Sequence, residues 1–191
     1  MRRLTTAAAA LALAGAGLVA TAGVAGAATG QVGKAASATA CSTAWGSSGK
    51  SATDSDSRPL KNIKTSQNTC YDRMVFDISG ATGKLGYHVG YVDKFHQDGS
   101  GEQIPVNGGA ILQVYVSAPS YDPATGRQTY AGKAGQPLPG VNITGYKTFK
   151  DTKFGASFEG QTQVGLGVRA KLPFRVLQSG DQLIVDVAHT W

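Results

Sequence analysis

The sequence is short of the residues that most often carry chemistry in proteins. It contains three histidines and twelve acidic residues, and no histidine has another at the H-x-H or H-x₃-H spacing that brings metal ligands together. No serine lies in a G-x-S-x-G turn. Gly99-Ser100-Gly101 instead has the composition of a tight turn that closes a hairpin between Asp93 and Ile104. We therefore expect no metal ion, no cofactor and no activated nucleophile.

Clusters of charge are also missing. Only 16% of the residues are charged, and the formal net charge is +6, which falls to +4 when Arg2 and Arg3 are subtracted. Because the chain has no run of arginine and lysine and no recognisable module for reading bases, we do not expect nucleic acid as a partner. A modest positive charge suits an acidic envelope polymer or an anionic lipid, and it serves solubility equally well.

Beyond residue 24 the chain has no apolar run long enough to cross a membrane. The run before it, Leu4 to Val24, follows Arg2 and Arg3 and precedes Ala25-Gly26-Ala27, the small-x-small pattern that a signal peptidase reads. A membrane-spanning helix is the alternative, but a run rich in alanine, glycine and threonine is weakly hydrophobic. We expect residues 1–27 to be a cleaved signal peptide. The mature protein is then secreted, or associated with the cell wall, without an integral membrane segment.

Cysteine is scarce, with Cys41 and Cys70 as the only two. Export places them in an oxidising compartment, which favours a disulfide over two free thiols. Such a disulfide would tie the segment around Trp45 to the first strand of the domain. No further ligand flanks either cysteine, so a zinc site is not predicted.

Helix-forming residues never cluster for long, so we do not expect long helices. Residues 28–40 are small and polar, and we expect them to form a disordered linker. Apolar residues alternate with polar ones from Pro59 onward, and a period of two indicates half-buried strands. The alternation occurs in Met74-Phe76-Ile78, Tyr87-Val89-Tyr91, Leu112-Val114-Val116, Val164-Leu166-Val168, Phe174-Val176 and Leu183-Val185-Val187, and Leu60 to Lys64 can add a shorter strand. We therefore predict a mainly β domain over residues 41–191, folded as a single antiparallel β-sandwich.

Two stretches interrupt this rhythm. Ser117 to Ile143 contains four prolines and several glycines, which predicts a long loop without regular strands. Lys147 to Phe158 fits either a short helical turn or an edge strand. Ser47 to Arg58 is also polar, and we expect any order there to come from the Cys41 disulfide and from Trp45 packing into a pocket.

Strand parity sends a set of polar side chains away from the predicted core. If their strands are neighbours, these side chains form one flat, basic face that can bind carboxylates and stack on sugars or peptides. The set consists of Arg73, His88, Tyr115, Gln163, Arg169 and Arg175. An ordinary solvated sheet face is the alternative. The long loop is a second candidate surface, because aromatic and basic residues alternate there at Tyr121, Arg127, Tyr130 and Lys133.

Several segments, in this order along the chain, resemble the AMIN-like domain of exported actinobacterial proteins. They are Tyr71 to Phe76, Tyr87 to Asp93, Asp98 to Gly101, Gly109 to Val116, Phe158 to Gly160, Pro173 to Val176 and Leu183 to Val187. The likeness extends from Cys41 to Trp191 and includes Ala44-Trp45-Gly46. AMIN domains are β-sandwich modules that direct cell-wall amidases to peptidoglycan, so the resemblance implies a non-catalytic module that faces the envelope. It implies no ligand residues, and we expect no catalytic domain beside it.

We expect a secreted, monomeric β-sandwich that binds a cell-envelope component, above all peptidoglycan or another anionic glycan, without catalysis. An envelope hydrolase that uses carboxylates such as Asp93 and Glu159 is one alternative. The other is a module that binds and regulates another exported protein through the loop from Ser117 to Ile143.

Overall fold

The alternating pattern forms strands in the computed structural model, which describes residues 41, 44–53, 58–78 and 80–191. The predicted signal peptide, 1–27, and the predicted linker, 28–40, lie outside the described residues. Within the described part of the chain there are strands and turns but no helix, and hence no helix able to span a membrane.

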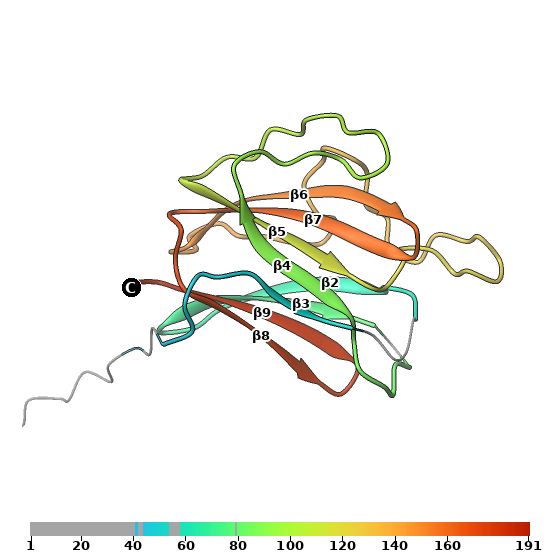
Figure 1. The fold of residues 1–191 in the computed structure, drawn as a ribbon, viewed down its shortest axis with the longest axis horizontal. Coiled ribbons are helices and arrows are strands. Elements are labelled where there is room, and N and C mark those ends of the chain that lie inside the picture. The colour runs from blue at the N-terminus through green and yellow to red at the C-terminus, as the bar shows by residue number, and fades with distance from the viewer. Residues whose placement is uncertain (1–40, 42–43, 54–57, 79) are drawn as a thin grey trace, which may run out of the picture. The chain divides into compact units, whose positions relative to one another are not determined.

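In the described residues, nine strands form two antiparallel sheets that face each other (Figure 1). The five-stranded sheet has the order β1-β4-β5-β7-β6, and the four-stranded sheet has the order β2-β3-β9-β8. The strands are β1 (Lys50–Ala52), β2 (Asn62–Gln67), β3 (Tyr71–Asp77), β4 (Tyr87–Val92), β5 (Ala110–Val116), β6 (Phe149–Phe158), β7 (Gln161–Val168), β8 (Phe174–Ser179) and β9 (Gln182–Ala188). The predicted antiparallel β-sandwich is confirmed.

The core lies between the two sheets and is made by the predicted alternation. Every second residue of β3, β5 and β9 turns inward, and the inward apolar side chains are buried, among them Phe76, Val114 and Val185. Since side chains of a strand point alternately to its two faces, the intervening residues of β3 and β5 remain partly exposed. The central strand β9 is buried on both faces, so its outward residues also lose contact with water.

Three stretches whose sequence has no clear periodicity have a definite structure. Residues 149–158, for which a helical turn and an edge strand were both predicted, form the edge strand β6. The stretch 117–143 is a loop with one isolated bridge, Tyr121 to Gln128, as predicted. In the polar stretch 47–58, where order was expected only from the disulfide and from Trp45, residues 50–52 form β1, which pairs with β4. This strand is short and mostly exposed, so its sequence shows no alternation of apolar and polar residues.

The disulfide between Cys41 and Cys70 is present and places the segment that follows Cys41 beside β3. The Trp45 ring lies edge-on to the Tyr71 ring, with 5.7 Å between their centres. The Gly46 carbonyl accepts a hydrogen bond from the Phe174 amide, at the start of β8. The disulfide, the ring contact and this hydrogen bond therefore hold the segment against the four-stranded sheet, as the pairing predicted.

The outer face of the five-stranded sheet is covered by the loop that joins β4 to β5. Phe95 of this loop is 0% exposed and lies directly over the β6 and β7 backbones. A Cβ atom added to Gly165 would lie 2.8 Å from the Phe95 ring, and one added to Gly155 would also lie 2.8 Å from it. Glycine at these two outward positions is what lets the ring approach the sheet. The loop appears above β6 and β7 in Figure 1.

Candidate functional site

The six residues predicted to share one face lie in three places. His88, Tyr115 and Gln163 are in register across β4, β5 and β7 of the five-stranded sheet. Arg73 and Arg175 flank Asp186 in the four-stranded sheet. Arg169 follows β7 and donates a hydrogen bond to the His189 carbonyl. The alternation along each strand correctly predicted which side chains point outward. It did not predict which sheet each strand belongs to, so the six residues do not form a single face.

The group on the five-stranded sheet is largely closed by the loop over it. Gln163 is 1% exposed; its amide donates to the His96 carbonyl at 2.7 Å and to the Tyr115 hydroxyl at 3.0 Å, and it accepts the Asp98 amide. Burial, together with the Asp98 carboxylate, raises the pKa of Tyr115, and the hydrogen bond from Gln163 opposes this. Gln163 thus anchors the loop, and among these three residues only His88 stays exposed.

The group on the four-stranded sheet is an open cluster around one buried carboxylate. Arg73 donates from Nε to Asp186 Oδ1 at 2.7 Å and from Nη2 to Oδ2 at 2.9 Å, while Arg175 Nε donates to Oδ2 at 2.8 Å. The Asp186 side chain is 0% exposed, whereas those of Arg73 and Arg175 are 26% and 32% exposed. The hydrogen bonds to Asp186 raise the pKa of Arg73 above its ordinary value. Two guanidinium groups share one carboxylate, so the cluster keeps a surplus positive charge at the surface.

Two aromatic rings complete this cluster. The Arg175 guanidinium lies 4.3 Å from the centre of the Trp45 ring and 5.2 Å from that of Tyr71. Arg73 lies 5.1 Å from the Tyr71 ring centre and donates a hydrogen bond to the Tyr71 hydroxyl at 3.2 Å. We call these five residues, Trp45, Tyr71, Arg73, Arg175 and Asp186, the arginine cluster. Its rings hold the guanidinium planes in place and remain half-buried.

An apolar strip borders the arginine cluster on the same face. Val75 pairs with Ile184, which pairs with Leu177, one row further along the sheet. Leu177 is 40% exposed, one of the few large apolar side chains in the described residues that reach the surface. This face therefore offers cationic, aromatic and apolar groups side by side, the combination that suits a ligand with both a carboxylate and a hydrophobic or sugar part.

Three members of the arginine cluster, Trp45, Tyr71 and Asp186, were not among the predicted site residues. Tyr71 and Asp186 have the same outward parity as Arg73 and Arg175, so parity would have admitted them to the face. Only the strand register places Asp186 directly between the two arginines. Trp45 was assigned to the disulfide-linked segment, and its position over Arg175 depends on that segment folding back onto β8.

The carboxylates proposed for hydrolysis are far apart in the structure. Asp93 follows Val92, whose row across the sheet includes Ile111, Gly167 and Asp151. Glu159 follows the far end of β6, where Phe158 pairs with Gln161, six residues along β7 from Gly167, which at about 3.3 Å per residue is roughly 20 Å away. A pair of catalytic carboxylates in a glycosidase lies within about 10 Å. Asp93 and Glu159 therefore do not form one hydrolytic site.

The buried pair of His189 and Asp72 is structural. His189 Nε2 lies 2.9 Å from an Asp72 carboxylate oxygen, and Nδ1 lies 3.1 Å from the Thr69 carbonyl. Asp72 also accepts the backbone amides of Thr148 and Phe149, at 2.6 and 3.1 Å. Because both ring nitrogens are engaged, the imidazole has no nitrogen left to exchange a proton with a substrate. Among the described residues, no three histidine, cysteine or acidic side chains converge as metal ligands.

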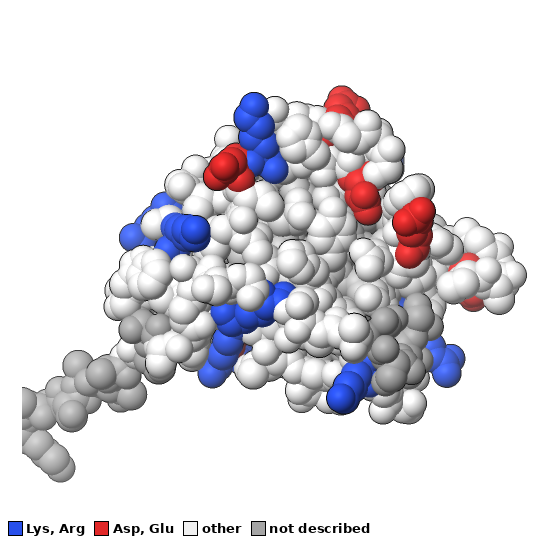
Figure 2. Space-filling view, in the orientation of Figure 1, with Lys and Arg blue, Asp and Glu red and all other residues white. Residues whose placement is uncertain are grey.

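The long loop presents less surface than its composition indicates. Tyr130 was expected to be an exposed aromatic, but it is 5% exposed, its hydroxyl donates to the Pro139 carbonyl and its ring lies against Phe154. Tyr121 is half-buried, whereas Arg127 and Lys133 are exposed. On the side shown in Figure 2, the acidic side chains lie over the five-stranded sheet and its loops, where basic ones also occur, while the part formed by the four-stranded sheet shows basic ones.

The family model of the AMIN-like domain matches residues 58–189, which is more than half of the chain. The chain belongs to the AMIN-like domain family. AMIN-like domains are non-catalytic modules associated with cell-envelope and peptidoglycan-related proteins. The match begins after Trp45 and Cys41, so these two residues lie outside the part that the family model covers. No curated protein and no solved structure matches the chain.

Proposed function

We propose that this AMIN-like domain protein is exported and binds a cell-envelope polymer, peptidoglycan or another anionic glycan, without catalysing a reaction. In this proposal residues 1–27 are removed on export and residues 28–40 link the domain to its new N-terminus. The disulfide and the family are consistent with an extracellular or envelope location.

The observation that carries the proposal is the surplus charge of the arginine cluster. Asp186 satisfies the Nε groups of both arginines, and the described residues offer no further hydrogen-bond partner to the terminal nitrogens of Arg175. Those N–H groups are directed by a fixed hydrogen bond and by Trp45, so a ligand carboxylate meets donors that are already ordered. Charge-assisted hydrogen bonds to a guanidinium are among the stronger polar contacts that a protein surface offers.

Peptidoglycan carries the groups that this surface would recognise. Its peptide stems end in carboxylates, which suit Arg73 and Arg175, and its sugar rings present apolar faces that stack on Trp45 and Tyr71. The apolar strip beside the cluster accommodates aliphatic side chains of the stems. His88, Tyr115, Gln163 and Arg169 lie outside this surface, so the proposal rests on two of the six residues that parity selected.

Co-sedimentation with isolated cell walls tests the proposal. We expect the purified protein to pellet with the walls at low salt and to be released at about 0.5 M salt, where charges are screened beyond a few ångströms. Arg175→Gln keeps Arg73 on Asp186, and we expect it to weaken binding about tenfold. Arg127→Gln is the matched control, because it removes an equally cationic side chain from the exposed loop and should leave binding unchanged.

Two results would overturn this assignment. A protein that stays in the supernatant at low salt does not bind the wall. Equal weakening by Arg175→Gln and Arg127→Gln would show that general positive charge, and not the arginine cluster, attracts the polymer. Circular dichroism of each variant separates loss of binding from loss of fold.

A further inference from the structure

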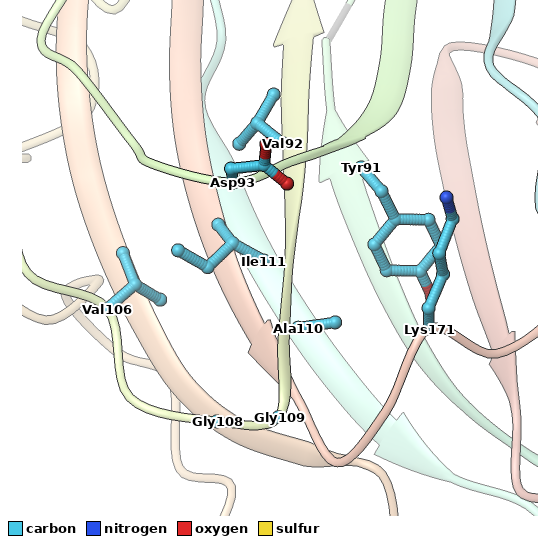
Figure 3. Close-up of a pocket in the computed structure, with 9 residues that line it drawn as sticks. All are labelled: Tyr91, Val92, Asp93, Val106, Gly108, Gly109, Ala110, Ile111 and Lys171. Carbon is cyan, nitrogen blue, oxygen red and sulfur yellow. The ribbon is translucent and has the colours of Figure 1, made fainter.

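A groove lies in the five-stranded sheet, where β4 and β5 part. The last paired residues of these strands are Val92 and Ile111, after which the chain turns away at Asp93 and leaves Ala110 without a neighbour from β4. The space between has a volume of about 400 Å³, within the range of sites that hold small molecules. Figure 3 shows the groove with the residues that line it.

The groove is lined by a few apolar side chains, by the backbone of Gly108 and Gly109, and by one rigid wall. Val92, Val106 and Ile111 are half-buried and supply apolar side chains. The wall is the Tyr91 ring, whose hydroxyl donates to the Leu172 carbonyl at 2.8 Å and accepts the Leu172 amide at 3.0 Å. These two hydrogen bonds hold the ring in one orientation. Burial raises the pKa of Tyr91 to about 12, so the phenol stays uncharged well above neutral pH.

Two opposite charges stand at the rim. Asp93 and Lys171 are exposed, and neither forms a hydrogen bond or ion pair with another described residue. The Lys171 ammonium group lies 5.9 Å from the centre of the Tyr91 ring. In Figure 3 the Asp93 carboxylate faces the side on which Tyr91 and Lys171 lie, whereas Ile111 and Val106 lie toward the opposite side. An anion and a cation thus frame one side of the opening, and apolar side chains frame the other.

From this arrangement we propose that the groove binds the zwitterionic end of an aliphatic α-amino acid, either free or as an unblocked branch of a peptide. Asp93 accepts hydrogen bonds from the ligand ammonium group, and Lys171 donates to the ligand carboxylate. The aliphatic chain lies across Ile111 and Val106. A purely anionic or purely cationic ligand satisfies only one of the two charges and is repelled by the other, so charge complementarity selects the zwitterion. This site is independent of the arginine cluster and does not require the proposed function.

The experiment uses norleucine and its blocked analogues as probes. Norleucine has both charges and a linear aliphatic chain, N-acetylnorleucine lacks the ammonium group, and norleucine amide lacks the carboxylate. Titration of the isotope-labelled protein is followed by amide chemical shifts in NMR. We expect saturable shifts at residues 91–93, 106–111 and 171 with norleucine, and affinities about threefold to fivefold lower for each blocked analogue, as for exposed ion pairs.

Variants assign each charge to its partner. Asp93→Asn should weaken norleucine binding and abolish the difference between norleucine and its N-acetyl form. Lys171→Gln should abolish the difference between norleucine and its amide. Glu102→Gln and Lys133→Gln remove exposed charges elsewhere and should change nothing. Absence of saturable shifts with all three probes overturns the proposal, and so does equal binding of blocked and unblocked forms. Wall binding that survives Asp93→Asn and Lys171→Gln leaves the proposed function standing whatever the groove does.

Discussion

Replacing Asp186 by asparagine tests whether one buried carboxylate holds the arginine cluster together. Asp186 accepts three hydrogen bonds from guanidinium groups, and its side chain has no contact with water. Removing the partner of fully buried charges costs about 3–5 kcal/mol. The two arginine side chains are 26% and 32% exposed, so water recovers part of that cost. We expect Asp186→Asn to lower the free energy of unfolding by about 2–3 kcal/mol.

The size of this effect is judged against two reference variants. Arg175→Met keeps both hydrogen bonds from Arg73 to Asp186 and loses a single one, so it should cost about 1 kcal/mol. Glu102→Gln alters an exposed side chain on the loop over the other sheet and should stay within about 0.5 kcal/mol of the parent.

Urea unfolding followed by circular dichroism, with the disulfide kept oxidised, measures all three variants. A loss of 2–3 kcal/mol lowers the melting temperature of a domain of this size by about 4–12 °C. The reasoning is refuted if Asp186→Asn costs no more than Glu102→Gln. It is also refuted if Arg175→Met costs as much as Asp186→Asn, because the carboxylate would then not be the element that both arginines need.

Other predictions concern the loop, the disulfide and a buried phenol. Gly165→Ala should cost about 1–3 kcal/mol in urea unfolding, and less in a protein that also carries Phe95→Ala, because the added methyl group meets that ring. Replacing Cys41 and Cys70 by serine opens a cross-link with a sequence separation of 29 and should cost about 3–4 kcal/mol, matching the parent after reduction. The raised pKa of Tyr91, about 12, means that the unfolded chain ionises first and that stability falls between about pH 10 and 12. Tyr91→Phe should reduce this fall, as measured by urea midpoints across that range.

Most of the fold was predictable because a strand with one buried face has apolar residues at every second position. Phe76, Val114 and Val185 each belong to a series of apolar residues at every second position, and each is buried as the pattern requires. β1 has no such series, since its three residues are mostly exposed and their place is decided by pairing with β4. The choice between helix and edge strand for residues 149–158 also needed the neighbouring strand β7, whose backbone groups pair with them.

The candidate site was predictable only in part. Parity found Arg73 and Arg175 on the outside, but it grouped them with His88 and Gln163, which belong to the other sheet. The outward glycines 155 and 165 could have indicated that this second face is covered. Glycine weakens a strand, and it occurs there because the Phe95 ring lies against the backbone. Parity describes one strand at a time, and a shared face depends on which strands become neighbours.

Local chemistry is enough to explain why this chain makes strands, a disulfide and an apolar interior. The strands and the apolar interior depend on residue type and on spacing of a few positions along the chain, and the disulfide was predictable because the chain has two cysteines. The arginine cluster and the groove beside Tyr91 needed the tertiary structure, since strand register and loop docking bring together groups such as Arg73 and Asp186, which are 113 residues apart. Register is set by the packing of the whole core, and no short stretch of sequence contains that information.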